Sequence, residues 1–199
     1  MNKLKAYLKR FFDISFSLIG LIVLSPFILL AWLISSIELG ENGFFFQQRV
    51  GKNGKPFFLC KIKTMRKING HDSTVTTSND KRISFSGKFF RKTKIDELPQ
   101  LINVLIGDMS FVGPRPDVRG FADLLKGNEK LILSIRPGIT GPASLAFRNE
   151  EEILSMQENP ERYNREVIYP EKVKINLEYI KNWTLLGDLG YIFKTIFKI

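Results

Sequence analysis

The longest apolar stretch of the chain runs from Ile14 to Ile37 and contains no charged residue. A helix of this length covers the roughly 30 Å hydrocarbon core of a bilayer. Ser25 and Pro26 lie near its centre, where proline removes a backbone donor and clashes with the preceding turn. The Ser25 hydroxyl can bond a carbonyl one turn earlier, which bends a helix further. The pattern therefore predicts a membrane helix that is broken at Ser25-Pro26.

Positive charge flanks this stretch on both sides. Lys3, Lys5, Lys9 and Arg10 precede it, and a second group follows: Arg49, Lys52, Lys55, Lys61, Lys63, Arg66 and Lys67. Positive segments tend to stay cytoplasmic, so a re-entrant helix, which keeps both groups on that side, is favoured over a straight span. A secretory signal is the third interpretation, but the stretch is too long and lacks a small-residue cleavage site.

The chain is therefore expected to consist of a membrane helix, residues 1–40, and one compact domain on the cytoplasmic side, residues 41–199. Two extended runs, 43–50 and 56–65, flank Asn53-Gly54, a strong hairpin signal. Helical patterns follow at 84–93, from Asp96 to Gly107, and at 118–130, 150–165 and 170–182. Two glycine–proline loops, 107–117 and 136–144, separate them.

The last segment, 185–199, is amphipathic. Its apolar face carries Leu189, Ile192, Phe193, Ile196 and Phe197. Such a helix either packs on a core or lies in the membrane interface, and the sequence leaves both open. The expected fold class is α/β, mostly helical with a short β-hairpin, a re-entrant membrane helix and interfacial amphipathic helices on a membrane-associated domain.

Charge and composition narrow the chemistry. The net charge of +10 suits an anionic partner, and beside a membrane segment lipid phosphate and nucleotide phosphate come before nucleic acid. One cysteine, Cys60, excludes an internal disulfide and a cysteine-rich zinc site, and His71 is the single histidine. A histidine base would have to be His71, and the composition favours catalysis by acidic side chains and a metal instead.

Asp96 and Glu97 are the leading candidates for such chemistry. As an isolated pair they would be read as residues that satisfy a helix N-terminus, supported by Pro99 in the first turn. However, Arg91, Lys92 and Lys94 precede them and Arg115 follows, a set that can surround a phosphate with cations.

Five motifs occur in order: KRFFD (Lys9 to Asp13), SP, KIKTM, DELPQLINVLIGDMSFVGPRP and RPGITG. Together they resemble the bacterial sugar transferase family, the monotopic phosphoglycosyl transferases, in the short form without additional transmembrane helices. The resemblance implies an enzyme at the cytoplasmic face of a bacterial inner membrane. It would move a phosphosugar from a UDP-sugar to undecaprenyl phosphate with release of UMP, as the first membrane step of polysaccharide, O-antigen or glycoprotein glycan assembly.

The resemblance also implies residue roles. Asp96 would be the nucleophile that holds the phosphosugar, and Glu97 a ligand of Mg²⁺; direct attack by the lipid phosphate, with Asp96 as a metal ligand, is the alternative. The implied substrate- and phosphate-binding positions are Lys61, Arg91, Arg115 and Asp188, with Lys63 as an alternative to Lys61. The implied membrane-interface positions are Lys9, Arg10, Asp13, Ser25 and Pro26. The first three also fit an ordinary salt-bridged helix end.

A different class of function also fits the composition: a membrane-anchored, non-catalytic binder of anionic lipid or nucleic acid. The clustering of basic residues around an acidic pair, without base-stacking aromatic motifs, argues against it, and no nucleic-acid partner is expected. Segment 147–170 is longer and more acidic than expected for the family. The identity of the sugar, the glycan pathway and self-association as a homo-oligomer stay open.

Overall fold

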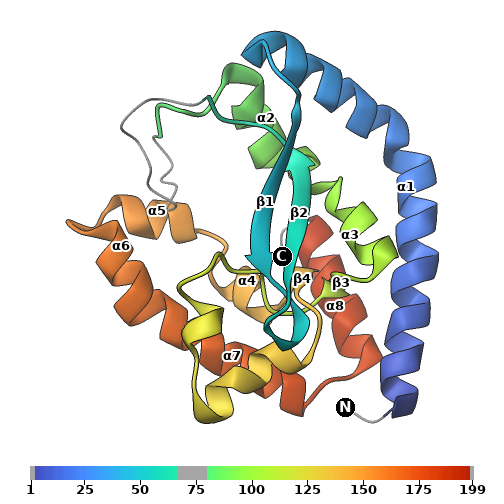
Figure 1. The fold of residues 1–199 in the computed structure, drawn as a ribbon, viewed down its shortest axis with the longest axis vertical. Coiled ribbons are helices and arrows are strands. Elements are labelled where there is room, and N and C mark those ends of the chain that lie inside the picture. The colour runs from blue at the N-terminus through green and yellow to red at the C-terminus, as the bar shows by residue number, and fades with distance from the viewer. Residues whose placement is uncertain (1–2, 67–79, 198–199) are drawn as a thin grey trace.

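Helices dominate the computed structural model, which describes residues 3–66 and 80–197 (Figure 1). His71 lies outside the described residues. The prediction of a mostly helical chain with a short hairpin is confirmed. The α-helices are α1 Lys3–Leu39, α2 Phe85–Thr93, α3 Gln100–Ile106, α4 Pro142–Ala146, α5 Glu150–Ser155, α6 Pro160–Tyr163, α7 Tyr169–Lys181 and α8 Leu185–Phe197. The strands are β1 Phe44–Val50, β2 Pro56–Ile62, β3 Ser110–Val112 and β4 Gly138–Thr140.

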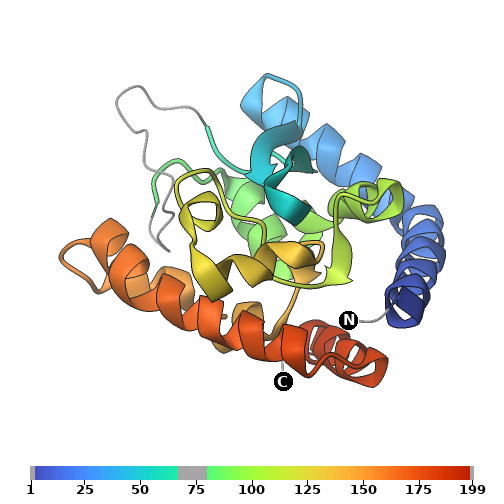
Figure 2. The same ribbon diagram turned by 60° about the horizontal axis from the view of Figure 1, so that its bottom comes forward.

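The apolar stretch forms α1, a curved helix that continues through Pro26 (Figures 1 and 2). The prediction of a break at Ser25-Pro26 is therefore wrong, although Ser25 behaves as predicted. Its hydroxyl donates to the carbonyl of Ile22 at 3.0 Å. Ile22 is the residue whose carbonyl loses its partner when proline occupies position 26. Ser25 thus satisfies the acceptor that Pro26 leaves open, and the helix can continue.

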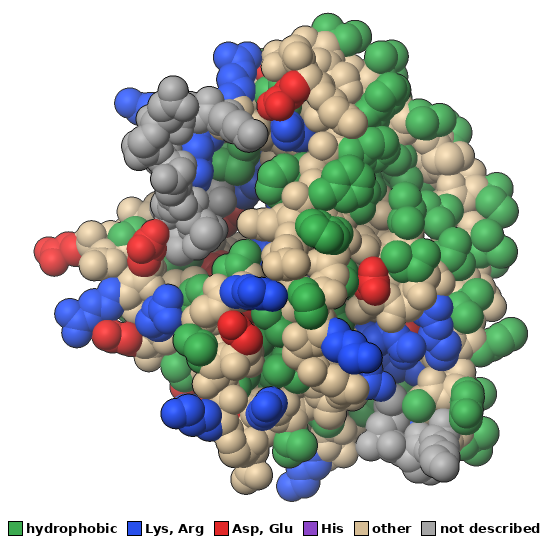
Figure 3. Space-filling model, in the orientation of Figure 1, with side chains coloured by type: hydrophobic (Ala, Val, Ile, Leu, Met, Phe, Trp, Pro, Cys, Tyr) green, Lys and Arg blue, Asp and Glu red, His purple; other side chains and the backbone are tan. Residues whose placement is uncertain are grey.

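The outer face of α1 is apolar, whereas its buried face is largely polar. The buried residues are Lys9, Asp13, Ser17, Ile28, Ala31 and Ser35. Large apolar side chains cover the outer face and form the apolar edge on the right of Figure 3. The helix is long and apolar enough to cross a membrane, with a mean hydropathy of 2.5 over an 18-residue window. Polar residues turned toward protein, with an apolar exterior, are typical of a helix in lipid.

Both halves of α1 are attached to the rest of the molecule. Near its start, the Asp13 carboxylate accepts a hydrogen bond from the backbone N–H of Phe111 at 3.1 Å. At its end, the Glu38 carboxylate accepts one from the backbone N–H of Phe85, at 2.7 Å, in the first turn of α2. The two ends of the apolar helix therefore lie on one domain.

The predicted hairpin is confirmed as the antiparallel pair β1–β2. Asn53 and Gly54 both have positive φ, and the N–H of Lys55 donates to the carbonyl of Lys52 across them. The sequence did not predict β3 and β4, a short parallel pair in which Val112 lies opposite Thr140. This pair joins the two glycine–proline loops.

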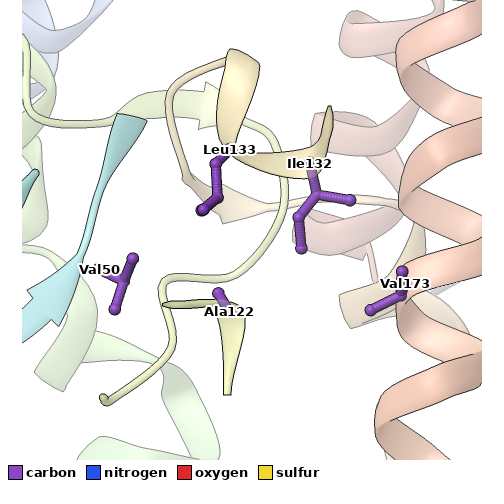
Figure 4. Packing of buried hydrophobic residues seen from close by; sticks show 5 residues of the cluster. All are labelled: Val50, Ala122, Ile132, Leu133 and Val173. Carbon is purple, nitrogen blue, oxygen red and sulfur yellow. The ribbon is translucent and has the colours of Figure 1, made fainter. Parts of the chain in front are cut away.

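Two predicted helices differ from the structure. Residues 118–130 form parts of two 3-10 segments, Ala122–Leu124 and Gly127–Ser134, because Gly127 has a φ of 53° and interrupts the helix. Residues 150–165 are helical but divided between α5, α6 and a π-helical turn, Asn164–Ile168. The 3-10 segments nevertheless contribute to a core between β1 and α7. Its members are Val50, Ala122, Ile132, Leu133 and Val173 (Figure 4).

The C-terminal helix α8 packs on the core through part of its predicted apolar face, and its place in the membrane interface stays a prediction. Ile192 packs against the buried cluster of Val112, Tyr179 and Trp183. The remaining residues of the predicted apolar face are exposed: Leu189, Phe193, Ile196 and Phe197. Figures 1 and 2 show α8 beside the N-terminal part of α1.

Candidate active site

Asp96 and Glu97 lie in a short 3-10 turn, Ile95–Glu97, between α2 and α3. We expected them in the first turn of the following helix, but α3 begins only at Gln100. Lys94 adopts a left-handed conformation with φ 62°, which ends α2 and redirects the chain. The turn therefore presents the two acidic residues separately from either α-helix.

The Asp96 side chain is buried, with a residue exposure of 4%. Its Oδ1 atom has no hydrogen-bond partner among the described residues. Burial and the adjacent Glu97 carboxylate raise the pKa of Asp96, while Lys61 opposes this shift. Buried polar atoms are rarely left unpaired, and perturbed carboxylates concentrate at functional sites. Asp96 is thus a candidate catalytic residue rather than a residue that stabilises the fold.

Glu97 is held by cations. It accepts a hydrogen bond from the Arg115 guanidinium at 3.3 Å, and the Lys94 ammonium lies 3.9 Å away. Burial disfavours the ionised form, but Arg115, Lys94 and Lys61 together hold the pKa of Glu97 below its usual value. The two neighbouring carboxylates therefore have different environments and are suited to different tasks.

The hairpin supplies two more cations. Lys61 lies opposite Phe45 in the β1–β2 register, with its ammonium 5.4 Å from the Phe45 ring centroid. Burial, followed by the charge of Arg115, lowers the pKa of Lys61 to about 8. Arg49 lies on the same strand as Phe45, and its pKa is lowered to about 10 by burial and by Arg115. The acidic side chains oppose these shifts: Asp96 and Glu97 act on Lys61, and Glu97 acts on Arg49. Both cations therefore lie close enough to interact with the acidic pair.

Arg49 is a site residue that the sequence analysis did not identify. Its Nε atom is buried without a hydrogen-bond partner among the described residues, and a guanidinium N–H donates to the Pro116 carbonyl at 3.2 Å. A signal was present: in an extended strand, Phe45, Gln47 and Arg49 alternate onto one face. The strand was predicted, but this face was not assigned to the site.

The predicted phosphate-binding residues divide into two groups. Lys61, Arg91 and Arg115 all act electrostatically on Asp96 or Glu97. Lys63, the alternative to Lys61, instead forms an ion pair with Glu41 at 2.9 Å.

Asp188 is not brought to the acidic pair. Its carboxylate is 1% exposed and forms an ion pair with Lys9, near the start of α1. It also accepts hydrogen bonds from Tyr179, at 2.7 Å, and from the Trp183 indole, at 2.9 Å. In this structure, Asp188 joins α1 to α8.

The motif residues Arg10 and Asp13 also make protein contacts. The Arg10 guanidinium donates to the carbonyls of Val104, at 2.6 Å, and Leu105, at 2.7 Å, near the C-terminus of α3. Asp13 additionally accepts a hydrogen bond from the Ser110 hydroxyl at 3.0 Å. These contacts agree with the simpler interpretation of the motif, in which its charges anchor a helix end.

The acidic pair is suited to a Mg²⁺ site in which substrate and water supply the remaining ligands. Among the described residues, no group of three or more His, Cys, Asp and Glu side chains is arranged to hold a metal. Mg²⁺ commonly needs only one or two carboxylates, with substrate phosphates and water completing its shell. The Glu97 carboxylate meets that requirement and leaves the unpaired Oδ1 of Asp96 available for another role.

The cluster as a whole can bind a polyanion and activate a carboxylate. Its members are Arg49, Lys61, Arg91, Lys94 and Arg115 around Asp96 and Glu97. Guanidinium forks and ammonium groups are the usual partners of phosphate oxygens. A buried carboxylate with an unpaired oxygen is the group that could react with a phosphate held there.

Comparison with known proteins agrees with this geometry. The chain is 34% identical to the exopolysaccharide production protein ExoY of Sinorhizobium fredii, over 94% of this chain and 83% of that protein. It is 36% identical to the UDP-glucose:undecaprenyl-phosphate glucose-1-phosphate transferase of Escherichia coli, over 96% of this chain but only 40% of that enzyme. It is 35% identical to the undecaprenyl-phosphate galactose phosphotransferase of Salmonella typhimurium, over 95% of this chain and 40% of that enzyme.

The family model described as bacterial sugar transferase matches residues 4–199, which include α1, the acidic pair and the cations around it. The chain therefore belongs to the bacterial sugar transferase family.

Proposed function

We propose that the chain transfers a sugar-1-phosphate from a UDP-sugar to undecaprenyl phosphate and releases UMP. The observation that carries this proposal is the buried, unpaired Oδ1 of Asp96 within a cluster of cations. The E. coli and Salmonella relatives support the reaction class, since they are named as sugar-phosphate transferases that act with undecaprenyl phosphate. The name of the Sinorhizobium relative supports a role in surface polysaccharide production.

The reaction proceeds in two displacements. The Asp96 carboxylate forms a bond to the β-phosphorus of the UDP-sugar while the bond from that phosphorus to the bridging oxygen breaks, and UMP leaves with this oxygen. A phosphate oxygen of undecaprenyl phosphate then attacks the phosphorus held by Asp96. The bond to Asp96 breaks, the carboxylate is restored, and the lipid carries the sugar through a diphosphate. A covalent intermediate divides one difficult transfer into two easier ones.

The surrounding cations make this attack feasible. A carboxylate that approaches a diphosphate meets like charge, which Lys61, Arg91 and Arg115 would offset by binding the phosphate oxygens. Arg49, beside Arg115, would add to the same field. Glu97 would hold Mg²⁺, which when bound neutralises phosphate charge.

The same proposal places the protein on one face of the bacterial inner membrane, as a monotopic protein with its domain in the cytoplasm. Residues 1–40 form the membrane helix and residues 41–199 the catalytic domain. This is supported by the apolar outer face of α1 and by the attachment of both its ends to one domain. A lipid phosphate at the membrane surface can then reach Asp96 while its hydrocarbon tail stays in the bilayer.

Labelling of introduced cysteines tests this topology, in a Cys60→Ser background. Asn2→Cys and Glu41→Cys should both react with a membrane-impermeant reagent from the cytoplasmic side only. Labelling of the two positions from opposite sides would show a straight span instead.

Incubation with UDP-sugars tests the chemistry. With UDP-sugar and undecaprenyl phosphate, the protein should release UMP, and Asp96→Asn should abolish release. With UDP-sugar alone, intact-mass analysis should show one added phosphosugar, which is absent from Asp96→Asn. If the protein releases UMP but forms no phosphosugar adduct with any of the sugars that it uses, direct attack by the lipid phosphate would be favoured. Salt-dependent binding of lipid or nucleic acid without turnover would favour a non-catalytic binder.

A further inference from the structure

Helix α5 lies in segment 147–170, outside the motifs that contain the acidic pair. Its first turn nevertheless reaches the cation cluster. The Glu151 carboxylate forms an ion pair with the guanidinium of Arg91, in the last turn of α2. Arg91 is one of the cations that act on Asp96. A side chain suited to binding substrate phosphate is therefore occupied, in this structure, by a carboxylate from a different part of the chain.

The neighbouring Glu150 makes a second ion pair, which is better protected. It lies 2.6 Å from the Lys172 ammonium on α7, and the side chains of Glu150 and Lys172 are 25% and 18% exposed. Glu150 also contributes to the raised pKa of Arg115, so it too lies close to the phosphate-binding cations. In the other pair the Arg91 side chain is also 18% exposed, but the Glu151 side chain is 49% exposed. α5 thus has one protected attachment to α7 and one exposed attachment to the site.

We propose that Glu151 occupies Arg91 in place of a substrate phosphate, and that α5 is a lid whose contact with the site is displaced when the nucleotide-sugar binds. This inference rests on the proposed function, since it takes the diphosphate of a UDP-sugar as the competing anion. Glu150 and Lys172 keep α5 attached to α7 while Glu151 leaves Arg91.

The energetics favour such an exchange. The Glu151 carboxylate is half exposed, so water and salt screen its ion pair with Arg91, and ordering both flexible side chains has an entropic cost that leaves the pair a small net contribution to stability. A phosphate group offers Arg91 more charge and a geometry that matches the guanidinium fork. Substrate can therefore displace Glu151 at small cost, while in the absence of substrate Glu151 still neutralises Arg91.

A permanent supporting role for Glu151 predicts the opposite result. If Glu151 only oriented Arg91 for substrate, its removal would weaken binding of the diphosphate. If it competes with the diphosphate, its removal strengthens binding. The sign of the change therefore separates the two roles.

Equilibrium titration with UDP and Mg²⁺, without lipid acceptor, tests the proposal on the full chain. UDP carries both phosphates and lacks the sugar. Glu151→Gln should lower the Kd for UDP about two- to fivefold relative to wild type, which is the effect expected for release of an exposed ion pair. The effect should diminish at high salt, where the original pair is already screened.

Glu152→Gln is the matched control. Glu152 is exposed on the same short helix, carries the same charge and makes no ion pair with a residue that the structure describes. Glu152→Gln therefore shows how far the change in net charge alone alters the Kd for UDP. In an Arg91→Ala background, Glu151→Gln should no longer change UDP binding, because the competition requires Arg91. Equal or weaker UDP binding in Glu151→Gln, compared with Glu152→Gln, would overturn the proposal.

Turnover in the same preparations separates this inference from the proposed function. If wild type releases UMP from a UDP-sugar but Glu151→Gln binds UDP no more tightly than wild type does, the proposal that α5 is a lid is wrong and the proposed enzymatic function stands. If wild type is inactive with every UDP-sugar, the proposed function is wrong. The competition at Arg91 is still decided by the UDP titration.

Discussion

The Lys9 ammonium and the Asp188 carboxylate form a buried ion pair that joins the first helix of the chain to the last. Lys9 is 6% exposed and Asp188 is 1% exposed. Tyr179 and Trp183 donate further hydrogen bonds to the same carboxylate. The pair thereby fixes the N-terminal part of α1 beside α8, and both helices carry exposed apolar residues. Its position suits assembly of the membrane-facing side rather than substrate binding.

Removal of one partner of this pair should destabilise the protein strongly. In Lys9→Met, the Asp188 carboxylate stays buried without its counter-charge, and loss of one partner of a buried pair costs about 3–5 kcal/mol. Thermal unfolding in detergent should therefore show a large decrease in Tm. The double variant Lys9→Met/Asp188→Leu should regain part of this loss, because position 188 then carries no buried charge that lacks its partner. Near-additive losses in the double variant would contradict a structural ion pair.

Local patterns were sufficient to predict most elements of the fold. The alternation around Asn53-Gly54 predicted β1 and β2, and the periodicity of 170–182 predicted α7. The predicted break of α1 failed because the sequence shows that Pro26 leaves the Ile22 carbonyl without its donor, but not that the Ser25 hydroxyl takes that donor's place while the helix continues. The structure shows that Ser25 satisfies the Ile22 carbonyl. The short strands β3 and β4 depend on pairing between distant segments, for which a single sequence carries little signal.

The candidate site could be predicted only in part, because the sequence shows which residues are neighbours in the chain but not which distant residues meet in the fold. Asp96, Glu97, Arg91 and Arg115 are near one another in the chain, and the motif around them identified the cluster. Asp188 has little motif around it, and only tertiary packing reveals Lys9 as its partner. The contact between Glu151 and Arg91 likewise joins residues far apart in sequence, so it could not be derived from local pattern.

Arg49 should contribute to catalysis although no motif indicated it. Its guanidinium contacts the Pro116 carbonyl beside Arg115 and lies in the field of Glu97. In Arg49→Ala, both the charge and the contact are lost, so kcat/KM for UMP release should fall at least about tenfold, corresponding to about 1.4 kcal/mol. Arg49→Lys keeps the charge without the fork and should give an intermediate value. Gln48→Ala, at an exposed neighbouring position, is the control; an Arg49→Ala enzyme within twofold of it would contradict the assignment.

Asp117 should make the protein less stable as the pH rises from about 4 to 6. Burial raises the pKa of Asp117 to about 6, against the opposing effects of Lys172, Tyr169 and Arg49. An unfolded chain would release this proton near pH 4. Between these values the folded state binds a proton that the unfolded state has lost, so this group's contribution to the free energy of unfolding decreases as the pH rises.

The comparison of wild type with Asp117→Asn isolates this contribution. Asparagine resembles the protonated carboxyl, so the two proteins should have similar stability at pH 4. At pH 7 the variant should be more stable by about 1–3 kcal/mol, as measured by chemical unfolding in detergent. A constant difference across this pH range would show that Asp117 titrates normally in the folded protein.

Gly138 should tolerate no side chain, because β4 passes too close to the loop after β3. A Cβ atom at position 138 would lie 2.1 Å from the backbone nitrogen of Gly113 and 2.7 Å from the backbone carbonyl carbon of Val112. These are backbone atoms of the parallel pair β3–β4, so the clash can be relieved only by separation of the strands. Gly138→Ala should therefore lose several kcal/mol of stability or fail to fold.

Gly190→Ala provides the matched control for this substitution. Gly190 lies within α8, and a Cβ atom there would meet nothing within 4 Å. Because alanine is favoured over glycine in a helix by up to about 1 kcal/mol, this variant should be as stable as wild type or more so. The two substitutions add the same methyl group, so a difference in Tm between them reports the space at each position. If Gly138→Ala unfolded at the same temperature as Gly190→Ala, the β3–β4 pair could not be as closely packed as the structure shows. The arrangement that brings the two glycine–proline loops together would then have to be revised.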